Sequence, residues 1–263
     1  MPFYLARGNE KDAIRAAHRS LLPVMLTGPT GCGKTRLVHH MAAELGRPVV
    51  TVTCHDDLTS GDLVGRYLVV GGDVRWIDGP LTVAVRTGSV CYLDEVAEAR
   101  RDTLAVLHSL LDDRRALYLE RTGEVLEAPP DFMLIASYNP SSRSLLKELK
   151  PSFRQRFVTL ALDYLPPADE QDVVERESGV DGEVAGRLVR AATALRQAQA
   201  GGVSEVPSTR VLVAAARLVA AGLPEEAAID LGVLNPLSAA PPVEEALREL
   251  LRAAGVTSPT TAR

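Results

Sequence analysis

The sequence predicts an α/β domain with a parallel β-sheet, followed by a smaller all-helical domain. Three observations support this prediction. Short apolar runs alternate with helical patterns over about the first 160 residues, a glycine-rich segment joins the first run to the first helix, and strand signals stop after Pro166-Pro167. We place the domain boundary near Asp163, so that residues 1–163 form the α/β domain and residues 164–263 form the helical domain.

Five short runs account for the predicted sheet. They are apolar, several are rich in β-branched residues, and they cover residues 24–26, 49–52, 90–93, 132–136 and 158–162. A helical face follows the first run, and Gly46 and Pro48 end that helix. Its apolar residues are Leu37, Val38, Met41, Ala42 and Leu45. Strands separated by helices are typical of a parallel sheet with crossover connections.

Two segments interrupt this alternation, and each predicts a β-hairpin. Residues 67–77 alternate in polarity around Gly71-Gly72, and residues 116–126 turn at Thr122-Gly123. The remainder, after Pro167, predicts at least three amphipathic helices. One carries Val184 to Leu195, the next carries Val211 to Val219, and a third covers 243–251.

Composition excludes several classes of protein. Hydrophobic residues make up 46% and charged residues 24% of the chain, as in globular domains, and the formal net charge is −5. We therefore expect no general nucleic-acid-binding surface. Three scattered cysteines predict neither a disulfide framework nor a zinc site. Because no apolar run reaches membrane-spanning length and the N-terminus lacks an apolar signal core, we expect a cytoplasmic protein without a membrane partner.

The glycine-rich segment fits the phosphate-binding pattern G-x-x-x-x-G-K-[ST] between a predicted strand and a predicted helix. Its residues are Gly28, Pro29, Thr30, Gly31, Cys32, Gly33, Lys34 and Thr35. We expect its backbone amides and the helix N-terminus to bind the phosphates of ATP, Lys34 to reach the β- and γ-phosphates, and Thr35 to bind Mg²⁺. A plain glycine-rich turn is the alternative to the phosphate loop. Within the loop, Cys32 is either a small residue or a site where oxidation regulates the protein.

Two carboxylates follow the run that ends at Leu93. Asp94 is predicted to hold Mg²⁺, directly or through water, and Glu95 to act as the general base toward the attacking water. An acidic pair after a strand is otherwise most often a solvated turn, but the upstream phosphate loop favours catalysis. Asn139 ends the next predicted strand, where its amide could orient the same water, although Asn139-Pro140 could also be a simple turn.

Together these motifs resemble the AAA+ superfamily and, within it, the MoxR branch. The glycine-rich loop, Leu93-Asp94-Glu95 and Asn139 match its Walker A, Walker B and sensor 1 motifs, and the hairpin at 67–77 resembles the helix-2 insert of that branch. Further segments are similar to the CbbQ/NirQ/NorQ group. They are Asp62 to Tyr67, Asp78 to Thr82, Ser137 to Pro140, Leu149-Lys150, Gln155 to Phe157, and Ser208 to Arg210.

The resemblance implies a ring-shaped homo-hexamer with ATP between subunits and a small helical lid. Arg156 would then be the arginine finger offered to the neighbouring subunit, with Arg154 as the alternative, and Arg210 would be the sensor 2 residue of the lid. The helix-2 hairpin would line the pore, where Tyr67 and Trp76 could contact a client or simply pack against each other.

The function implied is an ATPase that remodels a client enzyme together with a von Willebrand factor A-domain adaptor. For this group the clients implied are rubisco or a nitric oxide or nitrite reductase. One alternative keeps the ATPase and makes it the motor subunit of a DNA-directed, restriction-type complex. Another is a nucleotide-gated binding module with little turnover. The acidic composition argues against the DNA-directed motor.

Overall fold

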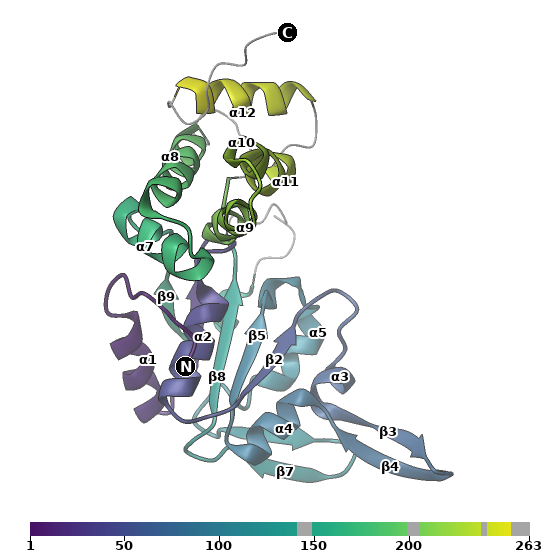
Figure 1. The fold of residues 1–263 in the computed structure, drawn as a ribbon. Coiled ribbons are helices and arrows are strands. Elements are labelled where there is room, and N and C mark those ends of the chain that lie inside the picture. Colours follow the sequence, from purple (N-terminus) through teal and green to yellow (C-terminus); the bar gives the residue numbers. More distant parts are fainter. Residues whose placement is uncertain (141–148, 199–205, 238–240, 254–263) are drawn as a thin grey trace. The chain divides into compact units, whose positions relative to one another are not determined.

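The structure is a computed structural model that describes residues 1–140, 149–198, 206–237 and 241–253 (Figure 1). Residues 1–29 and 33–162 form one compact unit, and residues 30–32 and 163–263 belong to a second. The chain changes from one unit to the other between Leu162 and Asp163.

The first unit contains a five-stranded parallel sheet, as the sequence predicts. Its strands lie in the order β2-β5-β8-β1-β9. They are β1 (Val24–Thr27), β2 (Val49–Thr53), β5 (Val90–Asp94), β8 (Met133–Tyr138) and β9 (Val158–Ala161). The observed strands shift by one or two residues from the predicted runs, and β8 extends to Tyr138. All strands point the same way, so the segments that follow β1, β5 and β8 meet at one edge.

Different helices cover the two faces of this sheet (Figure 1). Helices α1 (Glu10–Arg19) and α2 (Lys34–Glu44) pack against one face, where Leu37 and Met41 contact the cluster that contains Tyr92. Helices α3 (Ser60–Val64) and α4 (Pro80–Thr87) contribute to the cluster on the other face, which contains Cys91 and Leu93. Because both faces are covered, β5 is buried almost throughout and gives a continuous apolar run instead of alternation.

Both predicted hairpins are present. One joins β3 (Gly65–Val70) to β4 (Asp73–Asp78) through Gly71-Gly72, and the other joins β6 (Ala116–Leu119) to β7 (Glu124–Glu127). Gly71 and Gly72 have φ of 63° and 92°, a pair of positive values of the kind that a type I′ hairpin turn requires.

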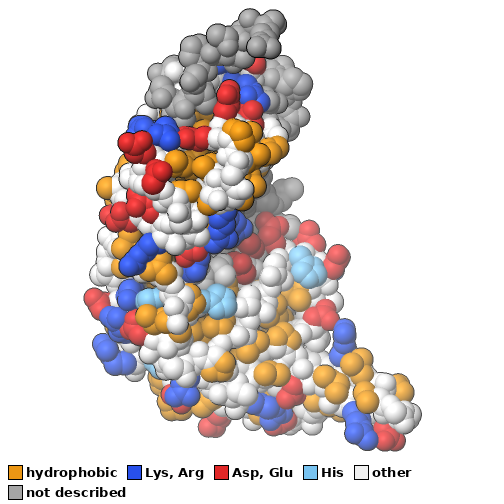
Figure 2. Space-filling view, viewed as in Figure 1, with side chains coloured by type: hydrophobic (Ala, Val, Ile, Leu, Met, Phe, Trp, Pro, Cys, Tyr) orange, Lys and Arg blue, Asp and Glu red, His pale blue; other side chains and the backbone are white. Residues whose placement is uncertain are grey.

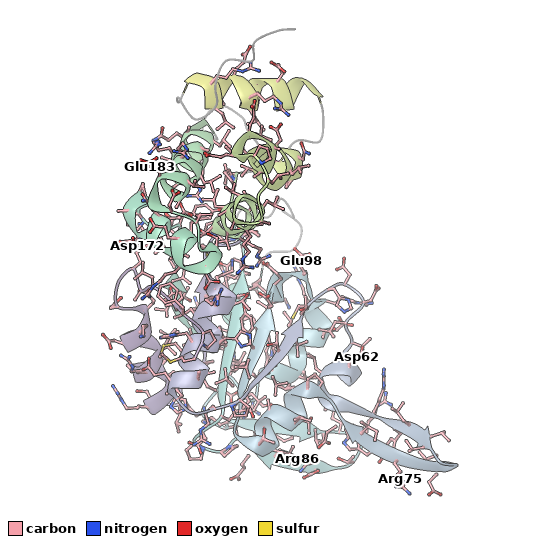
Figure 3. All side chains as sticks on the ribbon, viewed as in Figure 1. Asp62, Arg75, Arg86, Glu98, Asp172 and Glu183 are labelled. Atoms are coloured by element: carbon pink, nitrogen blue, oxygen red, sulfur yellow. The ribbon has the colours of Figure 1, made fainter. Side chains whose placement is uncertain are left out.

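The β3–β4 hairpin exposes an unusual number of apolar side chains (Figure 2). Val69 and Val74 face each other across the strands and are 73% and 68% exposed. Arg86 of α4 lies near the base of the hairpin (Figure 3). It donates to Asp78 of β4 at 2.8 Å and forms two hydrogen bonds with Glu124 of β7. Arg86 therefore links the base of the β3–β4 hairpin to the turn end of the β6–β7 hairpin.

Short segments complete the first unit. They are η1 (Val96–Glu98), α5 (Arg101–Leu104), η2 (Ala105–Leu107) and α6 (Pro151–Arg154).

The second unit is helical, as predicted, with its own apolar core. Its elements are α7 (Pro167–Ser178), α8 (Gly182–Ala198), α9 (Thr209–Ala220), α10 (Glu225–Ile229), η4 (Asp230–Leu234), α11 (Asn235–Leu237) and α12 (Pro241–Ala253). Leu188, Leu212 and Leu247 of three helices meet in the core. Gly232 allows η4 to approach α9 closely, because a Cβ there would lie 2.7 Å from the Cβ of Ala215.

An ion pair is buried in this helical unit. Glu170 of α7 is 0% exposed and accepts hydrogen bonds from both terminal nitrogens of Arg196 on α8, at 2.7 and 2.9 Å. The hydroxyl of Thr209, the first residue of α9, donates to the same carboxylate at 2.5 Å. One carboxylate therefore joins three helices.

Among the helices of the described residues, none combines the length and the hydrophobicity that crossing a bilayer would require.

Candidate nucleotide-binding site

The glycine-rich loop leads from β1 directly into α2. Gly31 has φ of 74°, and Gly33, the N-cap of α2, has φ of 102°, values that side-chain-bearing residues rarely adopt. The loop can curl tightly at these positions and present backbone N–H groups at the start of an 11-residue helix. That arrangement is typical of phosphate binding, because the helix dipole adds to the N–H donors.

Lys34 is held at the loop. Its side chain is buried, and Nζ donates to the carbonyl oxygens of Gly28 at 2.8 Å and Pro29 at 3.0 Å. These bonds place a positive charge inside the loop, where it would meet a polyphosphate.

A chain of hydroxyl groups connects the loop to the carboxylate after β5. The hydroxyl of Thr35 lies 3.2 Å from the hydroxyl of Tyr92, which donates to Oδ1 of Asp94 at 2.7 Å. Ser137 of β8 donates to the same oxygen at 2.7 Å. Its Oγ also lies 3.1 Å from the Tyr92 hydroxyl and accepts a hydrogen bond from the backbone N–H of Glu95 at 3.2 Å.

Thr35 and Asp94 fit a magnesium site. A hydroxyl and a carboxylate are hard oxygen ligands, and Mg²⁺ commonly combines one or two such groups with water and phosphate oxygens. The described residues contain no cluster of three His, Cys, Asp or Glu side chains that would form an all-protein metal site. This donor set suits a cation that arrives with a nucleotide.

Glu95 stands at a sharp change of direction after β5. Its backbone is left-handed, with φ of 54° and ψ of 49°, which is uncommon for a residue with a side chain. Burial raises the pKa of Glu95 above its usual value, while the Lys34 ammonium and a hydrogen bond from the backbone N–H of Asn139 act in the opposite direction. Asn139 follows β8 directly, so Glu95 and Asn139 lie next to each other at the same sheet edge.

The structure thus brings together Lys34, Thr35, Asp94, Glu95 and Asn139. Sequence reasoning missed Tyr92 and Ser137, which connect these residues. A hydroxyl-bearing side chain within an otherwise apolar run at 90–93 was the available signal.

Arg156 lies elsewhere on the same unit. It lies two residues before β9, whose first residue pairs with the first residue of β1, so it lies at the amino end of these strands, whereas the loop follows their carboxyl end. Its guanidinium donates to the carbonyl of His108 at 3.2 Å and to Asp112 at 3.4 Å. Arg114 also binds Asp112 and lowers the pKa of that carboxyl to about 2.

The other two candidate arginines are on helices. Arg154 is exposed at the last position of α6. Arg210 is the second residue of α9 in the helical unit.

Of the three cysteines, only Cys32 is partly exposed. Cys54 and Cys91 are buried, and burial raises the pKa of each thiol to about 12, so both stay protonated at neutral pH.

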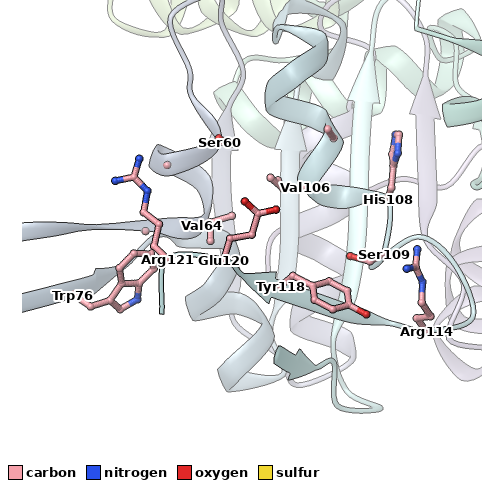
Figure 4. A pocket seen from close by; sticks show the side chains of 13 residues that line it. Ser60, Val64, Trp76, Val106, His108, Ser109, Arg114, Tyr118, Glu120 and Arg121 are labelled. Carbon is pink, nitrogen blue, oxygen red and sulfur yellow. The ribbon is translucent and has the colours of Figure 1, made fainter. Parts of the chain in front are cut away.

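A separate groove of about 350 Å³ is lined by α3, the base of the β3–β4 hairpin, η2, and β6 with the turn that follows it (Figure 4). The aromatic rings of Trp76 and Tyr118 and the charged Glu120 and Arg121 contribute to its walls. None of the residues that line it belongs to the loop or to the hydroxyl chain.

Comparison with known proteins agrees with this architecture. Residues 23–157 match the model of the AAA domain of the dynein-related subfamily, and residues 170–254 match the CbbQ/NirQ/NorQ C-terminal domain. The chain belongs to the CbbQ/NirQ/NorQ family of AAA+ proteins. The resemblance drawn from the sequence is confirmed, and the family fold is that of a nucleotide-binding P-loop domain with a helical C-terminal part.

Full-length relatives support the assignment to this family. The chain is 53% identical over 252 residues to protein NorQ of Paracoccus denitrificans, covering 96% of this chain and 93% of the relative. It is 50% identical over 250 residues to the denitrification regulatory protein NirQ of Stutzerimonas stutzeri, covering 95% and 91%. Protein CbbQ of Hydrogenophilus thermoluteolus is 47% identical over 247 residues, covering 94% and 92%.

Among solved structures, a RuvB variant of Thermotoga maritima superposes with a TM-score of 0.51 at 17% identity, covering 80% of this chain and 68% of that one. At this identity the similarity concerns the fold alone. The CbbQ/NirQ/NorQ chain therefore shares the fold of that protein over the superposed residues.

Proposed function

We propose that this CbbQ/NirQ/NorQ chain hydrolyses ATP to ADP and phosphate and uses that reaction to remodel a client enzyme. One observation carries the proposal. A continuous set of hydrogen bonds runs from Thr35 at the phosphate loop through Tyr92 and Asp94 to Ser137 and the backbone of Glu95. The groups expected to bind phosphate, cation and water are thus held together at the carboxyl ends of the sheet strands.

The residues divide the reaction among them. The loop amides and Lys34 bind the phosphates, and Thr35 with Asp94 holds Mg²⁺, which would neutralise charge on the β- and γ-phosphates. Glu95 accepts a proton from the attacking water while the water oxygen bonds to the γ-phosphorus and the bond to the bridging oxygen breaks. Asn139, whose backbone N–H binds the Glu95 carboxylate, orients that water with its amide.

The position of Arg156 supports an oligomer. β9 has four residues and β-strands rise about 3.3 Å per residue, so Arg156 lies roughly a strand length from the edge that carries the loop. It can act as an arginine finger only on the nucleotide of another copy. We therefore propose a homo-hexamer with ATP at the subunit interfaces, Arg156 supplied by the neighbour and Arg210 closing from the helical lid of residues 164–263.

We propose a denitrification reductase as one candidate client, which is supported by a relative named as a denitrification regulatory protein. The resemblance to the CbbQ/NirQ/NorQ group implies rubisco as the other candidate and a von Willebrand factor A-domain adaptor as partner. The exposed apolar hairpin β3–β4 is the segment that would contact the client.

Glu95→Gln tests the ATPase. This variant keeps the shape of the side chain but cannot accept a proton, so steady-state hydrolysis should fall by at least roughly 100-fold while ATP still binds. Retained hydrolysis would remove Glu95 from the reaction. A parent protein that binds ATP but never turns over, even with its adaptor, would leave only a nucleotide-gated binding module.

The same variant, held with ATP, can capture partners from a native extract. Recovery of an adaptor with rubisco or a reductase would support the remodelling function and identify the client. Recovery of nuclease subunits or DNA would contradict it and support the DNA-directed motor.

A further inference from the structure

The hydroxyl chain contains two buried residues that would not touch the nucleotide themselves. Tyr92 and Ser137 are both 0% exposed. The Tyr92 hydroxyl lies between the two candidate magnesium ligands, Thr35 and Asp94, and the Ser137 hydroxyl contacts Asp94 and Tyr92. Tyr92 is also the central residue of a strand whose other buried side chains are apolar. A phenylalanine would fill that volume equally well, so packing does not explain the hydroxyl.

Counting protons gives the hydrogen bonds a direction. A tyrosine hydroxyl has one proton, and the 2.7 Å contact between Tyr92 and Oδ1 of Asp94 requires it, because a carboxylate can only accept. In the 3.2 Å contact between Tyr92 and Thr35, Thr35 must therefore be the donor. With its proton directed at Tyr92, Thr35 can present its lone pairs toward a cation.

The same count orients Asp94. Tyr92 and Ser137 both donate to Oδ1, each at 2.7 Å, which fixes the carboxylate plane and leaves Oδ2 to turn toward a cation or its water. Ser137 in turn accepts the backbone N–H of Glu95 at 3.2 Å. The position of Glu95 is thereby coupled to the orientation of Asp94.

We propose that Tyr92, assisted by Ser137, is a positioning residue for the magnesium ion of bound ATP. It directs the proton of Thr35 away from the ion and fixes the carboxylate of Asp94. Partners behind metal ligands typically account for about 10–100-fold in metal affinity or activity. This inference rests on the proposed nucleotide site. It predicts that Tyr92 affects the binding of Mg²⁺ and not only the binding of the nucleotide.

The test is the contribution of Mg²⁺ to nucleotide affinity, measured without turnover. The dissociation constant of a non-hydrolysable ATP analogue is determined calorimetrically in EDTA and in excess Mg²⁺. The constant in EDTA divided by the constant in Mg²⁺ is the factor by which Mg²⁺ tightens binding, and this ratio is compared between variants. In Tyr92→Phe we expect the constant in EDTA to stay within about 2-fold of the parent and the ratio to fall about 10-fold. Ser137→Ala should change the ratio in the same direction.

Ser89→Ala is the matched control. Ser89 is a serine at the opposite end of the β5 region, is 1% exposed and is hydrogen-bonded to Thr87, so it tests the loss of a buried hydroxyl elsewhere. Its ratio should equal that of the parent. If Tyr92→Phe does not fold, as judged by its thermal melt, Ser137→Ala decides the question.

An unchanged ratio in the folded variants would overturn the inference while leaving the ATPase proposal intact. Equal weakening with and without Mg²⁺ would also overturn it, because that result indicates a general structural role. A parent protein that binds no nucleotide would overturn the proposed function itself, whereas one that binds nucleotide equally well without Mg²⁺ would overturn the inference about Tyr92 alone.

Discussion

Glu95 carries opposing electrostatic influences within a few ångströms. Burial is the largest of these and favours the protonated acid, whereas Lys34 and the N–H of Asn139 favour the carboxylate, and the net pKa is raised. A raised pKa brings a carboxyl closer to the range in which it can accept and release a proton at neutral pH. Ionising Glu95 in the folded protein therefore lowers the free energy of unfolding, a loss of stability that the active site tolerates.

This balance predicts a pH-dependent gain in stability for Glu95→Gln. Above the folded pKa the carboxylate is charged in both states, and only the folded state bears the burial cost. Below that pKa the folded state binds a proton, so the cost falls as the pH drops and is gone only below the ordinary glutamate pKa of 4.5. In protein without nucleotide, Glu95→Gln should therefore melt at a higher temperature than the parent at about pH 7.5. The difference in melting temperature should shrink as the pH is lowered toward 4.5, the ordinary pKa of glutamate.

Thermal melts over this pH range check the expectation. Glu120→Gln, which alters an exposed carboxyl, serves as the control and should give no comparable trend. A difference that grows as the pH falls would have the wrong sign and would contradict the buried, raised-pKa description of Glu95.

At the scale of elements, the helical unit depends on one buried charge pair. Glu170 and Arg196 have side chains that are 1% and 15% exposed, and the pair links α7 to α8 while Thr209 links the carboxylate to α9. Removing one partner of such a pair leaves an uncompensated buried charge. The placement of α9, and with it Arg210, depends on this carboxylate.

Glu170→Ala should therefore lower the free energy of unfolding by about 3–5 kcal/mol. Glu183→Ala is the control, because Glu183 pairs with Arg187 on the same helix as Arg196 but is 89% exposed, and its loss should cost less than about 1 kcal/mol. Denaturant titration of both variants measures the difference. Equal small losses would mean that water reaches the Glu170 site.

Elements also differ in how well the sequence predicted them. The strands of the sheet followed from continuous apolar runs, because both faces of the sheet are covered, and both hairpins followed from their turn residues. The helices around Leu188, Leu212 and Leu247 followed from periodicity, because one face of each is buried. Helix α1 and helix α7 were missed. Their charged residues dominate the pattern, and α7 buries Glu170, whose partner lies on another helix and cannot be identified from local sequence.

The site divides in the same way. The loop, Asp94, Glu95 and Asn139 could be proposed from sequence, since each follows a strand of a parallel sheet and such ends converge. The roles of Tyr92 and Ser137 could not, because they depend on which strands are neighbours. β5 and β8 are adjacent in the sheet although residues 116–127 form a hairpin between them in the chain.

At the scale of the whole molecule, the loop and Arg156 lie at opposite ends of the parallel strands of one sheet. Two inactive variants should consequently rescue each other. Lys34→Ala lacks the phosphate site and Arg156→Ala lacks the finger, but a mixed assembly contains interfaces in which an intact loop faces an intact arginine. We expect each variant alone to lose roughly 10³-fold or more in hydrolysis, as arginine fingers do in well-studied NTPases, and the mixture to regain a measurable part.

Hydrolysis by the two variants, separately and after co-assembly, checks this expectation. Arg154→Ala identifies the finger. If Arg156 has that role, Arg154→Ala should hydrolyse ATP by itself, without needing to be mixed with Lys34→Ala. Full activity of Arg156→Ala alone, together with loss in Arg154→Ala, would transfer the role to Arg154.

The separation of Arg156 from the loop has a consequence for how the protein behaves at different abundances. If one chain supplies the phosphate site and another supplies the arginine, a dilute chain can retain ATP but hardly turn it over. Specific activity should then rise steeply with protein concentration before it levels off. The amount of protein made would thus set a threshold. In a cell that makes few copies, the chains would hydrolyse little ATP until their concentration is high enough for them to associate.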